Sequence, residues 1–218
     1  MNPKIRKLTL IGMFSALAYV FTLVGHLVPI SFTDFLKYDP KDIIIVIAGF
    51  SLGPVSALII SVVVALLELV TISQTGIIGC VMNIISSVAF ACIASLFYKK
   101  FKTMGGAIAG LILASLATTA LMLLWNYIVT PIYMKIPREA IVSMLLPIFL
   151  PFNLIKAFLN SAIVMLIYKP VVKALRGAGL IRSEKTEEKG QGSIKIGVAL
   201  ASLFVIALMI ALFILLKQ

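Results

Sequence analysis

The feature that most constrains the fold is a set of long apolar runs without any charged side chain. Leu8–Ile30, Gly105–Met134 and Ile196–Leu216 contain no Asp, Glu, Lys or Arg, and each exceeds the roughly 20 residues that a helix needs to cross a bilayer. A transmembrane barrel would instead show short segments of alternating polarity. Hydrophobic residues make up 61% of the 218 residues, above the roughly 45–50% of soluble domains. We therefore predict an all-α polytopic membrane protein.

The basic residues predict how the helices are oriented. The net charge is +11, and the basic residues gather near the N-terminus, at Lys99–Lys102 and at Lys169–Arg182. All three clusters face the cytoplasm only if the apolar region Ile43–Tyr98 crosses the membrane three times, with a break at "GFSLGP". We therefore expect a multi-pass protein of the cell membrane with a cytoplasmic N-terminus. Its basic residues would contact anionic lipid rather than nucleic acid.

This break predicts a bundle of six transmembrane helices and one additional helix. The six lie near residues 6–29, 41–53, 54–71, 76–98, 105–130 and 143–169, and the seventh lies at 196–216. The second helix is about 17–20 Å long, too short for a ~30 Å hydrocarbon core. We expect its neighbours to form a cup that opens outward, with residues 29–40 as a lid. Residues 1–182 would form a six-helix substrate-binding domain, 183–195 a polar linker and 196–218 an additional transmembrane helix.

Three polar residues interrupt one face of the apolar segment Leu150–Pro170. At 100° per residue, Asn153, Lys156 and Asn160 lie within about 60° of one another. An ionisable group in a membrane costs about 2.5–3.5 kcal/mol, so Lys156 needs a cavity or a partner. One interpretation is a structural ion pair with Glu68. The other is the floor of a ligand cup, whose carboxamides and single amine suit a mostly neutral, planar ligand that forms hydrogen bonds.

Two further polar clusters are predicted at the depth of that amine. The outer turn after the third helix carries Glu68, Thr75 and Asn83. The fifth helix ends near Asn126, whose carboxamide requires a hydrogen-bond partner.

The sequence offers few residues for metal binding, catalysis or ATP binding. A single histidine and two cysteines inside an apolar run disfavour a metal site, and no nucleophile–base set can be assembled for an enzyme. The sequence contains no Walker motif, so uphill transport would draw its energy from a partner or an ion gradient. A proton-coupled carrier that uses Glu68 and Lys156 as a relay is therefore one alternative.

Small residues indicate where helices approach closely. Gly12 and Ala16 form one small-x-x-x-small pair, and Gly49 and Gly53 form another. Docking of a partner helix and packing within the chain explain this spacing equally well.

Several segments occur together in a distinctive order: "FLKYDPKD", "GFSLGP", "TGIIGCVMN", "LLWNYIVTPIYM", "PREA", "LLPIFLPFNLIKAFLN" and "YKPVVKALR". Together they cover about residues 4–182, and they resemble the riboflavin-specific substrate-binding subunits of energy-coupling factor (ECF) transporters. The resemblance implies a six-helix protein that binds riboflavin from outside and topples in the membrane to deliver it. Its partners would be a transmembrane coupling subunit and two cytoplasmic ATPases, and it would need no cofactor of its own. A subunit of the same class for a different vitamin is the second alternative.

The resemblance also implies which residues bind. They are Asn126, Asn153 and Lys156 and, by a looser match, Tyr38, Asp39, Thr75 and Asn83. The coupling subunit would dock at Gly12 and Ala16, although family members often carry alanine at the first of these positions. The seventh helix is a departure from the six-helix pattern.

Overall fold

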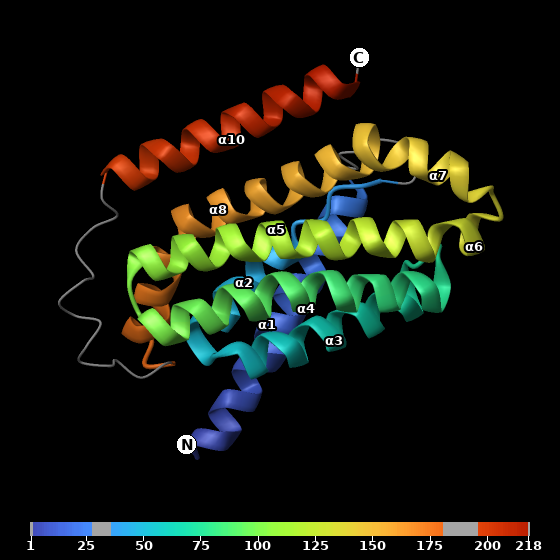
Figure 1. The fold of residues 1–218 in the computed structure, drawn as a ribbon. Coiled ribbons are helices and arrows are strands. Elements are labelled where there is room, and N and C mark those ends of the chain that lie inside the picture. Colours follow the sequence, from blue (N-terminus) through green and yellow to red (C-terminus); the bar gives the residue numbers. More distant parts are fainter. Residues whose placement is uncertain (1, 28–35, 181–195, 218) are drawn as a thin grey trace.

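The structure is a computed structural model that describes residues 2–27, 36–180 and 196–217. Its long helices lie side by side in a bundle (Figure 1). In chain order the elements are α1 (Pro3–Leu27), α2 (Lys41–Leu52), α3 (Pro54–Thr71), α4 (Gly76–Phe101), α5 (Met104–Ile128), α6 (Thr130–Met134), α7 (Arg138–Met144), the π-helical segment η1 (Leu145–Phe149), α8 (Leu150–Gly177) and α10 (Ile196–Lys217). The predicted linker 183–195 and residues 29–35 of the predicted lid lie outside the described residues.

The predicted polytopic all-α fold is confirmed. In the described part of the chain, six helices are long and apolar enough to cross a membrane. The short α2 is not among them, since its 12 residues extend only about 18 Å. Residues 41–50 of α2 are all buried, and α1, α3, α4 and α8 surround the helix. The short helix is thus covered by its neighbours, as the sequence predicts.

The helix predicted at residues 143–169 is longer at both ends. Residues 138–177 form one continuous helical stretch, with Pro147 in the π-helical segment and Pro170 inside α8. Proline removes a backbone donor and crowds the preceding turn, at a cost of about 3 kcal/mol. The side chains of Val172 and Leu175, beyond Pro170, pack into the main core, and their burial offsets that cost.

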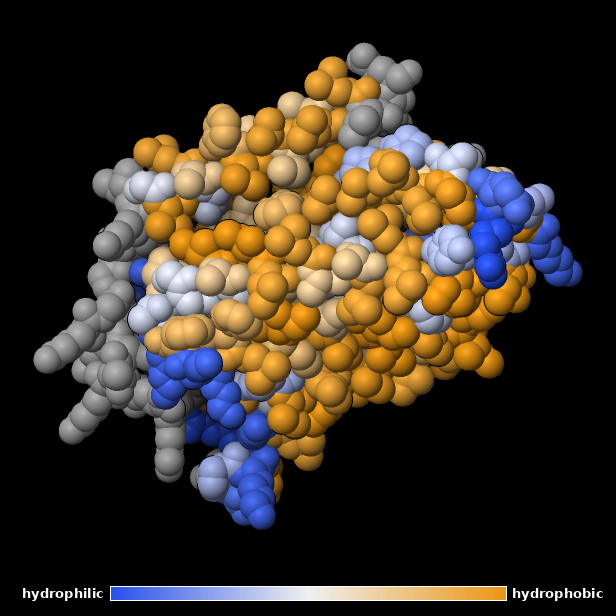
Figure 2. All heavy atoms as spheres, viewed as in Figure 1, coloured by the Kyte–Doolittle hydropathy of each residue, from blue (hydrophilic) through white to orange (hydrophobic). Residues whose placement is uncertain are grey.

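The basic segments gather at one end of the bundle. The Arg6 Nε donates a hydrogen bond to the Leu180 carbonyl at 2.7 Å, which places the start of α1 beside the residues that follow α8. The turn from α4 to α5 lies at the same end in Figure 1. On the face drawn in Figure 2, apolar side chains cover the middle of the molecule and hydrophilic ones mark its two ends. The start of α1, the turn from α4 to α5 and the residues after α8 thus lie at one end of the bundle, as the three-crossing topology requires.

Close contact between α4 and α5 depends on the absence of a side chain at Gly110. A Cβ atom there would lie 2.7 Å from the Phe97 Cβ and 3.0 Å from the Ala94 carbonyl oxygen. Gly110→Ala is therefore expected to lower the free energy of unfolding by about 1–3 kcal/mol through overpacking. Thermal unfolding in detergent would measure this. Gly105→Ala on the same helix is the control, because its new Cβ would meet no atom closer than 4.0 Å; equal effects of the two substitutions would contradict the prediction.

Candidate ligand-binding site

A small cavity lies where α2, α4, α5 and α8 meet. It is lined by Asp42, Ser86, Phe90, Thr118, Asn153, Lys156, Ala157 and Asn160. Its volume is about 10 Å³, which is room for one water molecule. Ligand sites for small organic molecules usually measure about 300–1,000 Å³. The predicted cup is therefore nearly filled by its own side chains, and a ligand would enter only after these side chains move.

Lys156 lies in this cavity opposite Asp42. The Lys156 Nζ is 3.4 Å from the Asp42 Oδ2, and the Ser87 hydroxyl donates to the other carboxylate oxygen at 2.5 Å. The Lys156 side chain is 18% exposed and that of Asp42 is 3% exposed. The predicted structural pairing of Lys156 with Glu68 is wrong, because Asp42 at the start of α2 lies closer in space. Asp42 is a site residue that sequence reasoning missed.

The carboxamides of α8 lie on the same side. The Tyr38 hydroxyl donates to the Asn160 Oδ1 at 2.6 Å, so the described part of the first loop, residues 36–40, contacts α8. The Asn153 Nδ2 donates to the Phe149 carbonyl at 2.8 Å. Burial, together with the Asp42 and Asp39 carboxylates, raises the pKa of Tyr38, so its phenol keeps the proton that it donates. The structure thus brings together three predicted site residues, Tyr38, Asn153 and Lys156.

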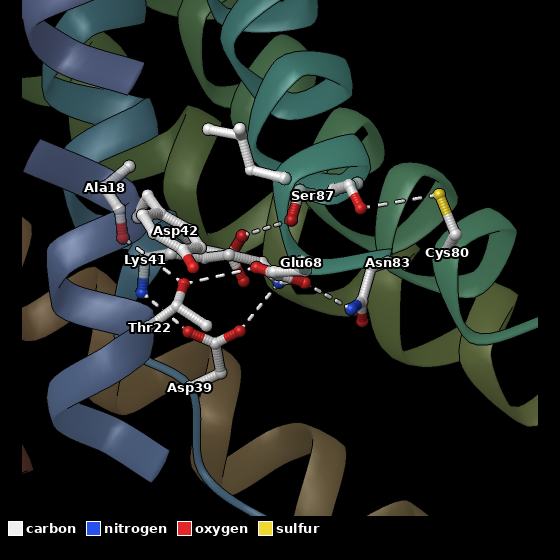
Figure 3. A network of polar contacts seen from close by, with 12 residues as sticks. Ala18, Thr22, Asp39, Lys41, Asp42, Glu68, Cys80, Asn83 and Ser87 are labelled. Carbon is white, nitrogen blue, oxygen red and sulfur yellow. Dashed lines mark hydrogen bonds and ion pairs between the residues drawn. The ribbon is translucent and has the colours of Figure 1, made fainter. Parts of the chain in front are cut away.

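A second polar network lies beside the cavity and centres on Lys41 (Figure 3). The Lys41 Nζ lies 2.6 and 2.9 Å from the two Glu68 carboxylate oxygens and 2.7 Å from the Asp39 Oδ2. The Asn83 Nδ2 donates to the Glu68 Oε2 at 2.6 Å, and the Thr22 hydroxyl donates to the Oε1 at 3.2 Å. These side chains converge from α1, α2, α3, α4 and the first loop. The network therefore joins four helices to Asp39 in the segment that directly precedes α2.

The charges in the two networks do not balance. Two amines, Lys41 and Lys156, face three carboxylates, Asp39, Asp42 and Glu68. Burial alone would raise the pKa of Asp39, but the ammonium groups of Lys41 and Lys156 lower it below its usual range. Asp39 is therefore ionised at neutral pH. The sequence signal for this cluster was the run "KYDPKD", which places three further charges around Asp39 at the start of the otherwise uncharged helix α2.

The remaining predicted residues lie elsewhere. Asn126 is buried and satisfied locally: its Nδ2 donates to the Met122 carbonyl, and its Oδ1 accepts from the Thr130 hydroxyl. Thr75 is exposed just before α4, and neither residue lines the cavity. Asn83 belongs to the Lys41 network rather than to the cavity wall.

The predicted docking residues lie on an open surface. Gly12 and Ala16 are exposed on α1, and a Cβ added at Gly12 would meet no atom within 4 Å. In the described part of the chain, this face is therefore accessible to another helix. Gly49 differs, because a Cβ there would lie 3.1 Å from the Cβ atoms of both Ala57 and Ser95. The absence of a side chain at Gly49 therefore allows α2 to pack closely against α3 and α4 within the chain.

Comparison with known proteins agrees with this architecture. A family described as "ECF transporter, substrate-specific component" matches residues 6–168. The riboflavin transporter FmnP of Bacillus subtilis is 28% identical over 80% of this chain and 98% of that protein. The riboflavin transporter RibU of Staphylococcus aureus is 29% identical over 78% of this chain and 93% of that protein.

A solved structure is also similar. It is described as the "S component of a bacterial ECF transporter", and it matches with a TM-score of 0.66 and 28% identity over 79% of this chain and 99% of that chain. The α10 helix lies beyond the residues that the family matches. The chain belongs to the family of substrate-specific components of ECF transporters, as the resemblance of its sequence motifs implied.

Proposed function

We propose that this chain is the riboflavin-binding subunit of an ECF-type vitamin transporter. It captures riboflavin outside the cell, with its N-terminus in the cytoplasm, and delivers the vitamin inward when coupled to a transmembrane subunit and two ATPases. The observation that carries the proposal is the cavity between α2 and α8, where an amine and carboxamides face apolar side chains. The named riboflavin transporters among its relatives support the choice of vitamin.

The chemistry of the cavity fits the ring system of riboflavin. The pyrimidine edge of isoalloxazine presents a carbonyl, an N–H and a second carbonyl, which a carboxamide such as that of Asn153 complements. The Lys156 ammonium donates to a ring carbonyl or to N1. Phe90 and Ala157 supply apolar surface for the ring faces. Of the looser matches, Asp39 is assigned to the ribityl hydroxyls, whereas Thr75 does not line the cavity and is assigned no contact with the ligand.

Binding requires the first loop to move. Because the cavity holds only about 10 Å³, riboflavin must displace the Tyr38 hydroxyl from Asn160 and separate Lys156 from Asp42. Both contacts are replaced by contacts with the ligand.

Purified protein tests the proposal directly. A detergent preparation from cells grown with riboflavin is expected to be yellow and to show flavin absorption bands. Protein stripped of ligand should quench flavin fluorescence on titration, and unlabelled thiamine or biotin should not compete. A preparation that binds one of those vitamins and not riboflavin would assign it to a different member of the family.

The ion-coupled alternative is less well supported by the geometry. Glu68 pairs with Lys41, and Lys156 pairs with Asp42, so the proposed relay residues belong to separate networks. Dissipating the proton gradient in vesicles that retain ATP separates the two mechanisms. Uptake should persist if ATPases drive it, and it should stop if protons do.

The docking surface on α1 gives a prediction for the assembled transporter. Gly12→Leu is expected to reduce co-purification with the coupling subunit by roughly tenfold or more, because a bulky side chain separates helix backbones that small residues allow to approach. Riboflavin binding by the isolated subunit should be unchanged. Val24→Leu, also exposed on α1, is the control. Normal assembly of the Gly12 variant would remove this face from the interface.

A further inference from the structure

The additional helix α10 contacts the bundle through one narrow stripe. Its partly or fully buried positions include Val198, Ser202, Met209 and Phe213, which recur at helical spacing. Between and around them, side chains such as Phe204, at 69% exposed, face outward. The helix α10 lies along α8 (Figure 1).

The two ends of this stripe contact different parts of the protein. Val198 packs against the main core. Met209 and Phe213 instead pack against a separate apolar cluster around Phe152 and Ile155 of α8. This cluster also includes Leu36 of the first loop and Ile148 of η1. The outer part of α10 therefore joins the three segments that lie next to the binding site.

The cluster lies beside the ligand-binding face of α8. Phe152 immediately precedes Asn153 in the chain, and Ile155 immediately precedes Lys156, so each pair points about 100° apart around the helix. Leu36 lies two residues before Tyr38, whose hydroxyl contacts Asn160. A displacement of the cluster would thus move the cavity wall and the loop that covers it.

Two features of the start of α8 and the first loop make apolar contacts with α10 important for holding them together. The α8 helix follows the π-helical segment Leu145–Phe149, and such segments interrupt the regular backbone ladder. The first loop must also separate from α8 before a ligand can enter the cavity. Apolar contacts that hold Leu36 and Phe152 together oppose that separation.

We infer that Met209 and Phe213 are positioning residues for ligand binding: through Leu36, Phe152 and Ile155 they hold residues 36–40 against the start of α8 and slow the release of bound riboflavin. This inference rests on the proposed function. It assigns to α10 a role in retention of the ligand, beyond that of an additional membrane anchor. The family matches residues 6–168, so α10 is added to a domain that the family shares.

The test compares substitutions at the two ends of α10 in the full-length protein. Met209→Ala/Phe213→Ala is expected to raise the riboflavin dissociation rate about five- to tenfold, since affinity changes within one site fall mostly on dissociation. Stopped-flow fluorescence after mixing with excess unlabelled competitor measures that rate. Val198→Ala, partly buried at the other end of α10, and Phe204→Ala, facing outward, should release riboflavin within about twofold of the rate of the unsubstituted protein.

Thermal unfolding of the ligand-free variants separates positioning from general stability. We expect Val198→Ala to lower the unfolding midpoint without changing the rate of riboflavin release. The conservative variant Phe213→Leu should release riboflavin as slowly as the unsubstituted protein. If the double variant releases riboflavin at the unchanged rate, α10 does not position the site. If the unsubstituted protein binds no riboflavin, the proposed function itself fails and the inference fails with it.

Discussion

Replacing Lys156 with alanine is expected to weaken riboflavin binding at least tenfold. The ammonium is the only amine among the residues that line the cavity, and a hydrogen bond to a charged group contributes about 1.5–3 kcal/mol. Since about 1.4 kcal/mol corresponds to a factor of ten in affinity, losing this donor suffices for the effect. Titration of the stripped protein by flavin fluorescence measures it.

The substitution also leaves Asp42 without its cation, and that effect must be separated from lost ligand contact. Lys156→Ala/Asp42→Asn removes the uncompensated carboxylate and should recover thermal stability without recovering affinity. Lys173→Ala, exposed on the same helix, should leave affinity unchanged. Unchanged affinity in Lys156→Ala would remove Lys156 from the site.

The topology was predictable because the bilayer imposes simple rules on sequence. A helix must supply about 20 apolar residues to cross alone, so the shortness of α2 and the need to cover it followed from counting residues. The position of Lys156 in an apolar helix likewise showed that it needed a cavity or a partner. Both expectations depend only on local sequence, and both agree with the structure.

The partners within the site were not predictable from the same information. Glu68 was the single charge in a long apolar region, so it was the obvious candidate partner for Lys156. The actual partner of Glu68 is Lys41. Lys41 lies at the start of α2, where a basic residue is equally typical of an anchor at the membrane boundary. Which amine meets which carboxylate depends on the depth and rotation of each helix, and neither can be derived from spacing within a single helix.

The end of α8 shows a similar limit. Pro170 follows Lys169 at the end of an apolar run, and proline after a basic residue is a reasonable signal for a helix end. The helix continues because Val172 and Leu175 reach the core. Packing between distant segments thus overrides a local preference.

Lys41→Ala is expected to lower the free energy of unfolding more than Gly110→Ala does. Lys41 is 2% exposed, and its ammonium is the shared cation of Asp39 and Glu68. Removing one member of a buried ion pair costs about 3–5 kcal/mol, because the remaining charge stays buried without compensation. The midpoint of thermal unfolding in detergent should fall accordingly. Lys37→Ala, four residues earlier in the first loop, is the matched control and should change stability little.

The pH dependence of this loss distinguishes a charge effect from lost packing. In the unsubstituted protein the pKa of Asp39 is lowered, so its contribution to stability is present above the unfolded-state pKa and is lost as the pH falls through the folded-state value. In Lys41→Ala, burial acts on Asp39 without its main cation, so protonation at mildly acidic pH relieves the penalty. The difference in stability between the two proteins should therefore shrink as the pH is lowered from 8 towards 5. A difference that stays constant over this range would show that Lys41 stabilises the fold through its alkyl chain, and that Asp39 does not hold the first loop over the site by its charge.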